Sequence, residues 1–307
     1  MTLSPQLTPE QLNDQFGIKG QVAFKVGAGG LTMIEVSNPQ ASATIALQGA
    51  HLLTWTPQGQ QPVIWLSTAA KFAPGKSVRG GIPICWPWFG PHEREAGYPA
   101  HGYARTVEWD VIETEALASG ATRLLFRFSG NEASARMWPH TTPCDYQITV
   151  GTALELELIT RNQGATPVTI GQALHTYFAI SDIRDVTVEG LDGCPYLDKV
   201  DGFTRKQQDG AVEFSGETDR IYLDSTADCI IDDAALERRI RISKRNSAST
   251  IVWNPWVEKA EQMGDMGERS YLGMVCVESA NAADDTVTLP AGGQHNLYVR
   301  YEVEPRS

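Results

Sequence analysis

The sequence predicts an all-β protein, a large antiparallel sandwich with a few short helices. Most of its 307 residues fall in short runs that alternate apolar and polar side chains and are separated by Gly, Pro, Asn and Asp. Helical spacing occurs in only two short segments, and no repeat of solenoid or propeller length and no linker interrupts the chain. We therefore expect residues 21–307 to form one catalytic domain and residues 1–20 to be an N-terminal cover segment.

The expected strands follow one another from residue 21 to the C-terminus. Leu154, Leu156 and Leu158 alternate with Glu155 and Glu157, which is the pattern of a strand with one face in water. The final run alternates in the same way. Strands are expected at 31–36, 43–47, 107–111, 123–129, 154–158, 186–188, 230–231, 240–242, 250–253, 271–277, 287–289 and 297–303.

Two segments carry helix signals. Thr8 can cap a short helix that starts with Pro9, and this helix is expected to cover the periphery of the sandwich. Near the C-terminus, Asn254 can cap a second helix that has Pro255 at its first position and ends at Gly264. Both helices are short, so neither changes the fold class.

The charge and composition exclude several classes of partner. The formal net charge is -12 and no run is rich in Lys and Arg, which argues against nucleic acid and anionic membranes. The hydrophobic share is 42% and no long apolar stretch is present, and residues 1–20 do not resemble a signal peptide. We expect a cytoplasmic protein that holds any anionic substrate with a local cluster of arginines.

The cysteines do not indicate a metal site or a disulfide framework. Cys85, Cys144, Cys194, Cys229 and Cys276 are odd in number, widely separated and never spaced as Cys-x-x-Cys. Reduced, buried thiols are therefore expected. No metal is predicted.

The stretch from residue 79 to residue 105 contains more special residues than any other. Its glycines and prolines predict a backbone that is neither plain strand nor plain helix. Arg79 and Arg105 stand at its ends, His101 lies beside the second, and Trp86 offers an apolar wall. These residue types together favour a pocket for a small polar anion. The alternative is that the aromatic residues close the end of the sandwich and that the arginines pair with structural carboxylates.

Three further residues are candidates for chemistry. His175 lies among apolar and aromatic neighbours, Glu278 ends an apolar strand, and Asp219 precedes an aliphatic run. Each has a simple structural explanation: a buried histidine is usually structural, a carboxylate at a strand end often caps the next turn, and Asp219 can pair with Arg220 or with Arg79 or Arg105.

The order of these residues resembles that of the hexose-6-phosphate 1-epimerases, a branch of the enzymes related to aldose 1-epimerase. One shared motif is His101-Gly-Tyr-Ala-Arg105. The resemblance spans most of the chain and rests on segments 47–52, 64–67, 79–90, 101–105, 138–140, 174–178, 218–222, 253–255, 263–266 and 275–278. Runs of this length and order are far more specific than any single triplet.

This resemblance implies a galactose-mutarotase-like β-supersandwich that interconverts the α and β anomers of a sugar phosphate without a metal or organic cofactor. The matching positions are His175 as acid and Glu278 as base. Ligand contacts are implied for Arg79, Arg105 and Asp219, with His101 beside them. Ala100 replaces a Gln of some relatives, which removes one side-chain contact. The implied partner is a small sugar phosphate, and the protein is expected to be a monomer or weak oligomer.

The chemistry suits these residue types. Opening the hemiacetal requires removal of the proton from the anomeric hydroxyl and delivery of a proton to the ring oxygen. A carboxylate with an ordinary pKa of ~4.3 can accept the first proton, and an imidazole with a pKa of ~6.5 can donate the second if a neighbour keeps it protonated. Glu278 and His175 are expected to play these parts, and to exchange them when the ring closes again.

Three alternatives remain open at this point. One is a mutarotase for unphosphorylated aldoses. Another is a non-catalytic sugar-binding domain, which would not need a matched His and Glu. The third is a thiol hydrolase that uses Cys85 or Cys276, because alternation turns Cys276 and Glu278 to the same face of a strand. Neither cysteine lies in a recognisable nucleophile motif, and the run around Cys276 is typical of a core strand.

Overall fold

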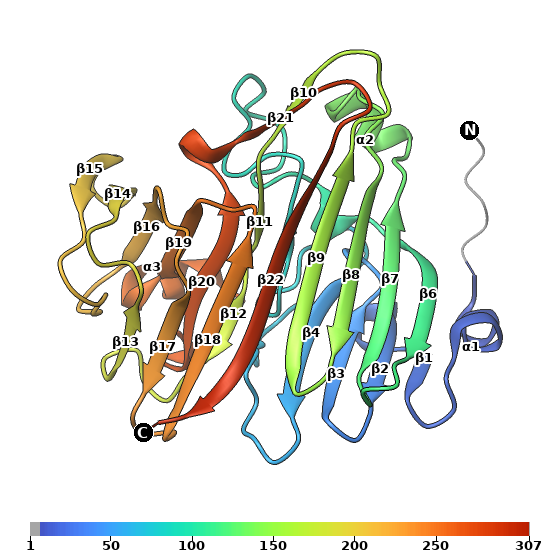
Figure 1. The fold of residues 1–307 in the computed structure, drawn as a ribbon, viewed down its shortest axis with the longest axis horizontal. Coiled ribbons are helices and arrows are strands. Elements are labelled where there is room, and N and C mark those ends of the chain that lie inside the picture. Colours follow the sequence, from blue (N-terminus) through green and yellow to red (C-terminus); the bar gives the residue numbers. More distant parts are fainter. Residues whose placement is uncertain (1–6, 307) are drawn as a thin grey trace.

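The computed structural model describes residues 7–306, and in this part of the chain nearly all regular structure is β (Figure 1). The strands form two eight-stranded sheets, here called sheets I and II, a four-stranded sheet III and a two-stranded ribbon. Neighbouring strands pair antiparallel. The prediction of an all-β sandwich with few helices is therefore confirmed.

The strands of the three sheets have the following bounds. Sheet I runs in the order β15 (Thr204–Gln207), β14 (Pro195–Asp198), β16 (Thr218–Tyr222), β19 (Ser249–Asn254), β20 (Met274–Asn281), β11 (Gln172–Leu174), β5 (Ile84–Cys85), with β12 (Tyr177–Ala179) also on β20. Sheet II runs β13 (Val186–Glu189), β17 (Cys229–Asp233), β18 (Arg238–Arg245), β22 (Gln294–Pro305), β9 (Ala153–Arg161), β8 (Cys144–Val150), β7 (Thr122–Phe128), β6 (Asp110–Ala116). Sheet III runs β1 (Val22–Val26), β2 (Thr32–Ser37), β3 (Ala41–Ala46), β4 (His51–Pro57), and the ribbon pairs β10 (Val168–Ile170) with β21 (Val287–Leu289).

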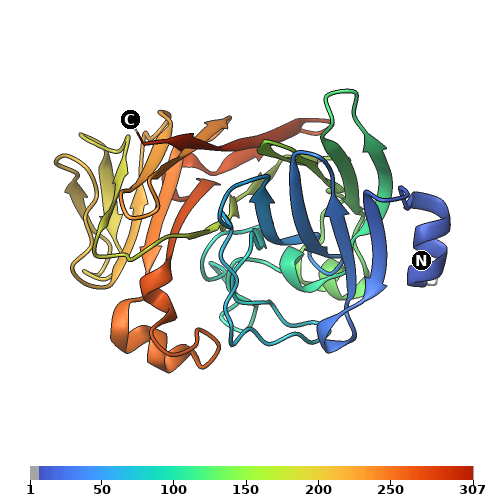
Figure 2. The ribbon, with the colours of Figure 1, turned by 90° about the horizontal axis from the view of Figure 1, so that it is seen from below.

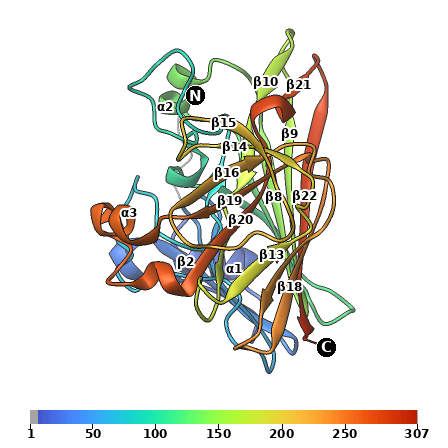
Figure 3. The same ribbon diagram turned by 90° about the vertical axis from the view of Figure 1, so that its left-hand side faces the viewer.

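The helices lie outside the sheets. They are α1 (Pro9–Phe16), α2 (Glu132–Met137) and α3 (Trp256–Met263), with short 3-10 turns η1 (Ala28–Gly30), η2 (Ala104–Thr106), η3 (Ser270–Gly273) and η4 (Ala283–Asp285). Helix α3 projects on the side of the molecule opposite to β22 (Figures 2 and 3). None of the helices within residues 7–306 has the length and apolar character needed to cross a membrane.

One continuous apolar core joins the three sheets. It takes residues from sheet III such as Ile34, from sheet II such as Leu156, and from sheet I such as Val277. Strand β9 shows how the sequence pattern produces this: Leu154, Leu156 and Leu158 are fully buried, while the alternating glutamates are partly exposed. The predicted strand with one wet face is confirmed.

Strand β20 of sheet I has apolar side chains on both of its faces. The alternation of these side chains between the two faces determines which of them lie at the functional site. Val275 and Val277 enter the main core, whereas Met274 and Cys276 join a second cluster on the other face of sheet I. Glu278 has the same parity as Cys276 and therefore faces that second cluster. A carboxylate in this place is covered by protein and is not exposed to bulk water.

The N-terminal helix forms as its caps predict. Thr8 and Gln11 form a reciprocal capping box, in which the Thr8 hydroxyl accepts a hydrogen bond from the backbone N–H of Gln11. Leu12 is buried in the main core, and Asn13 exchanges hydrogen bonds with the Phe24 backbone of β1. The helix thus lies against the edge of the sandwich, where a cover segment is expected.

Two predicted strands begin three residues later than the sequence indicated. Strand β20 starts at Met274 because residues 270–273 form the turn η3, around the Asn254 side-chain amide, which donates to the carbonyls of Tyr271 and Met274. Strand β6 starts at Asp110 and not at 107, because residues 107–109 connect the turn η2 to the strand. Trp109 is held there by a hydrogen bond from its indole to the Ala104 carbonyl.

The second predicted helix is shorter by one residue. Helix α3 begins at Trp256, with Pro255 as its N-cap, and ends before Gly264, which adopts the left-handed conformation. The Asn254 Oδ1 accepts the Trp256 N–H at 2.9 Å. Asn254 is therefore not the N-cap that was predicted, but its side chain accepts the first helical N–H from one position before the cap.

Candidate active site

The stretch 79–105 has an irregular backbone, as predicted, with only Ile84–Cys85 in a strand. Gly81 and Gly102 have φ of 68° and 70°. A Cβ on Gly81 would lie 2.4 Å from the Leu52 carbonyl oxygen, and one on Gly102 would lie 1.9 Å from that of Trp86. Only glycine permits these close backbone contacts. They fix the path of the segment that carries Arg79, His101 and Arg105.

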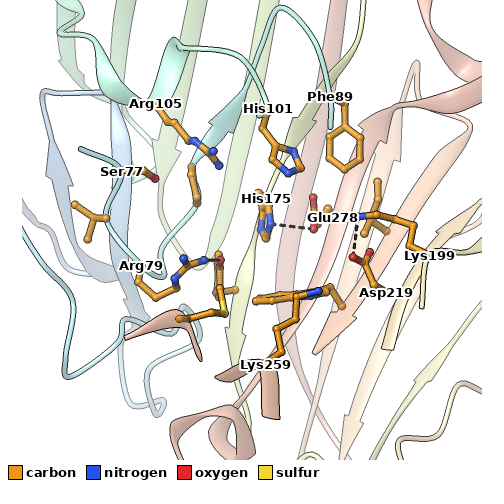
Figure 4. Close-up of a pocket in the computed structure, with 16 residues that line it drawn as sticks. Ser77, Arg79, Phe89, His101, Arg105, His175, Lys199, Asp219, Lys259 and Glu278 are labelled. Atoms are coloured by element: carbon orange, nitrogen blue, oxygen red, sulfur yellow. Dashed lines mark hydrogen bonds and ion pairs between the residues drawn. The ribbon is translucent and has the colours of Figure 1, made fainter. Parts of the chain in front are cut away.

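This segment covers one side of a cavity of about 350 Å³ over the second-cluster face of sheet I (Figure 4). The floor comes from sheet I and from the short link between β11 and β12. Helix α3 and the β14–β15 turn supply the remaining wall. The lining residues are Ser77, Val78, Arg79, Pro83, Phe89, His101, Arg105, His175, Tyr177, Lys199, Asp219, Ile251, Trp253, Lys259, Met263 and Glu278.

His175 and Glu278 meet on the floor of this cavity. The His175 Nε2 lies 3.3 Å from the Glu278 Oε1, and the two side chains are 13% and 1% exposed. His175 follows β11, and its backbone N–H donates to the Pro83 carbonyl. Glu278 lies within β20, opposite Ile251 of β19. Segments about 100 residues apart in the sequence therefore bring one acid–base pair together.

Burial disfavours the charged form of both members of this pair. It raises the pKa of Glu278 well above its usual value, and the negative charge of Asp219 raises that pKa further. The pKa of His175 is lowered well below its usual value by burial and then by His101, Arg105 and Arg79. The expectation that neighbours would keep the imidazole protonated is therefore wrong for the unliganded protein, because these neighbours oppose its charge.

Arg79 lies in the cavity wall but already has protein partners. Its Nε is 3.0 Å from the Asp265 Oδ1, and its Nη1 donates to the Tyr177 hydroxyl at 3.0 Å. Ser67 fixes the same arrangement, since its N–H donates to the Arg79 carbonyl and its Oγ donates to the Asp265 carbonyl. Arg79 therefore pairs with a carboxylate, as the structural alternative expected, although with Asp265 and not with Asp219.

Arg105 is different because it has no such partner. Its Nη2 donates to the Ala100 carbonyl at 2.9 Å, and it forms no ion pair with a carboxylate of residues 7–306. Its guanidinium points into the cavity (Figure 4). Ala100 thus lacks the side chain that some relatives have at this position, but its backbone carbonyl contacts Arg105.

Asp219 lies on the opposite side of the cavity from Arg105. Its Oδ2 is 2.7 Å from the Nζ of Lys199, a residue at the end of β14. Lys259 of α3 also reaches the cavity and pairs with Glu217 at 2.7 Å. The predicted pairing of Asp219 with Arg220 is not formed. Each of these lysines is neutralised by one carboxylate, so Arg105 carries the unpaired positive charge.

His101 lies beside the pair of His175 and Glu278, with its ring centroid 6.0 Å from that of His175. Burial, followed by the charges of Arg105 and Lys199, lowers the pKa of His101 to about 3, so the ring is neutral at pH 7. Its Nδ1 accepts a hydrogen bond from the Gly90 N–H. The neutral ring therefore carries its proton on Nε2 and can donate to a ligand.

Trp86 is the one predicted site residue that the structure places elsewhere. It is 1% exposed, belongs to the main core, and donates its indole N–H to the Thr160 hydroxyl. It does not line the cavity, so the expectation that its ring forms the apolar wall is corrected. Phe89 and Trp253 supply that wall instead. The density of aromatic residues was a correct signal for a pocket, but it did not reveal which of them face inward.

Several lining residues were not singled out from the sequence. Tyr177 and Trp253 do lie in the segments of the family resemblance, which was the signal that could have found them. Asp265, the partner of Arg79, lies in another of these segments. Lys199 and Lys259 lie in no recognised motif. They reach the cavity only because the β14–β15 turn and α3 fold over sheet I, and this arrangement has no local sequence signature.

The cysteines do not support a thiol hydrolase. All five are free, and Cys85 and Cys276 are fully buried. Burial raises the pKa of Cys85 to about 12 and that of Cys276 well above its usual value. Both are protonated thiols at neutral pH, whereas the thiolate is the nucleophile.

Comparison with known proteins agrees with this geometry. The family model of aldose 1-epimerase matches residues 32–302. This chain belongs to the aldose 1-epimerase family. The match makes it an epimerase-type enzyme, as predicted, and not a non-catalytic sugar-binding domain.

Individual relatives cover most of the chain. An Escherichia coli K12 protein provisionally named a glucose-6-phosphate 1-epimerase is 39% identical over 255 residues, which is 83% of this chain and 84% of the relative. A Salmonella typhimurium protein with the same provisional name is 38% identical over 281 residues, 91% of this chain and 88% of the relative.

Solved structures give the same fold. A protein from Salmonella typhimurium, described provisionally as a mutarotase, superposes with a TM-score of 0.87 at 34% identity, over 98% of this chain and 96% of that one. A galactose mutarotase-like protein from Lactobacillus casei has a TM-score of 0.68 at 16% identity, over 89% of this chain and 100% of that one, and shows the fold alone. The predicted galactose-mutarotase-like fold is confirmed.

Proposed function

We propose that this enzyme interconverts the α and β anomers of a hexose 6-phosphate, with glucose 6-phosphate as the foremost substrate, and that His175 and Glu278 transfer the protons. The observation that carries the proposal is the 3.3 Å approach of His175 Nε2 to Glu278 Oε1 on the floor of a cavity that also contains two guanidinium groups. The names of the relatives from Escherichia coli and Salmonella typhimurium support the choice of substrate.

The pair supplies both proton transfers that ring opening needs. Glu278 takes the proton of the anomeric hydroxyl while His175 gives a proton to the ring oxygen. The open aldehyde then rotates about the bond between its first two carbons, and the transfers run in reverse as the ring closes on the other face. The pair holds one proton in total before and after the reaction, so no cofactor is required.

A bound phosphate favours the charge state that this mechanism uses. In the free enzyme the positive charges of Arg105 and Arg79 help to lower the pKa of His175. A dianionic phosphate beside those guanidinium groups offsets their charge, so the imidazolium becomes easier to form. Phosphate recognition and acid catalysis are thereby coupled.

Arg105 is the main phosphate ligand in this proposal, with Arg79 at its side. Only the Nη2 of Arg105 has a partner within residues 7–306, the Ala100 carbonyl, and a planar guanidinium can give two parallel hydrogen bonds to phosphate oxygens. Arg79 keeps Asp265 and Tyr177 as partners and contributes mainly its charge. Asp219 has its Oδ2 held by Lys199, which leaves Oδ1 to accept hydrogen bonds from sugar hydroxyls.

The second candidate function is that of a mutarotase for unphosphorylated aldoses. The ion pair between Arg79 and Asp265 favours this candidate, because the carboxylate reduces the positive charge that is available to bind a phosphate. Anomer exchange measured by NMR for glucose 6-phosphate, galactose 6-phosphate, mannose 6-phosphate and free glucose separates the two. The proposal expects at least one phosphorylated hexose to exchange faster than free glucose at equal concentration. A preference for free glucose over all three phosphates would contradict it.

The free thiols support a reducing compartment for this enzyme, such as the cytoplasm.

A further inference from the structure

Cys276 adds a third potential ligand atom to the catalytic pair. The Cys276 Sγ, a ring nitrogen of His175 and a carboxylate oxygen of Glu278 all lie within 4.8 Å of one another. Cys276 and Glu278 are two residues apart on β20 and face the same side of sheet I. Cys276 is fully buried and pairs with Tyr177 on one neighbouring strand and with Trp253 on the other. The anomer exchange proposed above makes no use of this thiol.

The spacing of the three groups suits a tetrahedral ion. Nitrogen and oxygen ligands bound to zinc at ~2.0–2.1 Å are about 3.4 Å apart in a tetrahedron. The observed distance between His175 Nε2 and Glu278 Oε1 is 3.3 Å. A thiolate bound at ~2.3 Å lies about 3.6 Å from the other ligands, so a side-chain shift on the order of 1 Å brings the Cys276 Sγ into place.

An unpartnered carboxylate oxygen points to a ligand at the same place. Within residues 7–306, the Oε2 of Glu278 is buried and forms no hydrogen bond. A buried carboxylate oxygen without a donor is costly, and a cation can relieve that cost. Imidazole, thiolate and carboxylate are also the ligand types that zinc-like ions select.

We propose that His175, Cys276 and Glu278 form an inhibitory site for a thiophilic divalent cation such as Zn²⁺ or Cd²⁺. His175 and Glu278 line the cavity and give the ion its entry, and Cys276 holds it from beneath. The fourth coordination position remains for solvent. The thiol proton and the one proton held by the His175–Glu278 pair pass to solvent as the bonds to the metal form. The ion is an inhibitor and not a cofactor.

Inhibition follows because the ion occupies the atoms that exchange protons with the sugar. This consequence rests on the function proposed above, whereas metal binding itself does not. The test therefore follows binding and activity separately. A protein that binds the ion but shows no anomer exchange would contradict the proposed function while leaving the metal site intact.

The test uses Cd²⁺ with a Cys194→Ser reference protein, because Cys194 is the one cysteine of the five that is partly exposed. Cd²⁺ is titrated while thiolate-to-metal charge-transfer absorption and glucose 6-phosphate exchange are recorded. We expect one ion per chain, absorption that grows as exchange is lost, and reversal of both by EDTA. No charge-transfer absorption in the reference protein would overturn the proposal.

Matched cysteine variants locate the site. Cys276→Ser and Cys85→Ser are made in the reference protein, since both residues are buried in the same apolar cluster and only Cys276 belongs to the ligand trio. Cys276→Ser should lose the absorption and bind Cd²⁺ at least about tenfold more weakly, while Cys85→Ser binds like the reference. Equal binding by Cys276→Ser would overturn the proposal.

A second variant tests the site if Cys276→Ser does not fold. Glu278→Gln in the reference protein should weaken Cd²⁺ binding about tenfold, and unchanged binding would overturn the proposal.

Discussion

The phenol ring of Tyr177 lies parallel to the imidazole of His175, with centroids 4.9 Å apart and planes at 14°. The Tyr177 hydroxyl accepts a hydrogen bond from Arg79, and Trp65 also stacks on the Tyr177 ring. Tyr177 thus connects the arginine of the cavity wall to the orientation of the His175 imidazole.

Tyr177 variants separate the stack from the hydroxyl. Tyr177→Phe keeps the ring but leaves Arg79 with one fewer hydrogen bond, so KM for glucose 6-phosphate should rise several-fold with kcat within about twofold. Tyr177→Leu also removes the stack that orients His175, so kcat should fall about tenfold or more. Steady-state kinetics of both variants is the measurement. Equal kcat for the Phe and Leu variants would contradict a positioning role for the ring.

Arg105→Ala should weaken the use of phosphorylated substrate more than that of free glucose. Charged hydrogen bonds contribute roughly 1.5–3 kcal/mol each, so kcat/KM for glucose 6-phosphate should fall about tenfold or more. Arg79→Ala should also lower the exchange of free glucose, because Arg79 supports Tyr177.

The control for Arg105 is Arg136→Ala, which removes the same charge from an exposed helix position whose partner is Glu132. It should leave both substrates unaffected. A proportional loss for both sugars in Arg105→Ala would argue against its role as a phosphate ligand.

The pH dependence of exchange should respond to Asp219. The mechanism needs one proton on the pair, so activity falls at high pH when Glu278 loses it. Because the charge of Asp219 helps to raise the pKa of Glu278, Asp219→Asn should move the alkaline limb of kcat/KM to lower pH. Asp284→Asn is the control, since Asp284 is 80% exposed and does not line the cavity. An alkaline limb that stays in place or moves to higher pH would count against this electrostatic coupling.

Much of this site was predictable from the sequence because family motifs mark it. His175, Glu278, Arg79, His101, Arg105 and Asp219 do line one cavity. The exceptions have physical causes. Trp86 is in the core because the direction of a side chain in an irregular glycine-rich segment does not follow strand alternation, and Lys199 comes from a turn placed only by tertiary folding. The lowered pKa of His175 is caused mainly by burial, and the extent of burial cannot be read from the residue type.

Glu278→Gln should stabilise the fold at alkaline pH. The pKa of Glu278 is raised in the folded protein above its ordinary value. The stability that this group contributes is therefore complete at pH values below its ordinary pKa and is lost as the pH rises through the raised pKa of the folded state. An uncharged glutamine has no such dependence. Thermal unfolding at pH 4.5 and pH 8.5 should show an advantage of the variant that is larger at pH 8.5. A larger advantage at pH 4.5 would reverse the sign assigned to the shift.

Anomer exchange in Glu278→Gln is the most direct test of the proposed mechanism. The substitution keeps nearly the same side-chain volume and removes the proton acceptor. Exchange between α- and β-glucose 6-phosphate, followed by NMR saturation transfer at matched protein concentration, should fall at least ~10²-fold while circular dichroism and thermal unfolding show an intact fold. Near-normal exchange by the folded variant would contradict the assignment of Glu278 as the base.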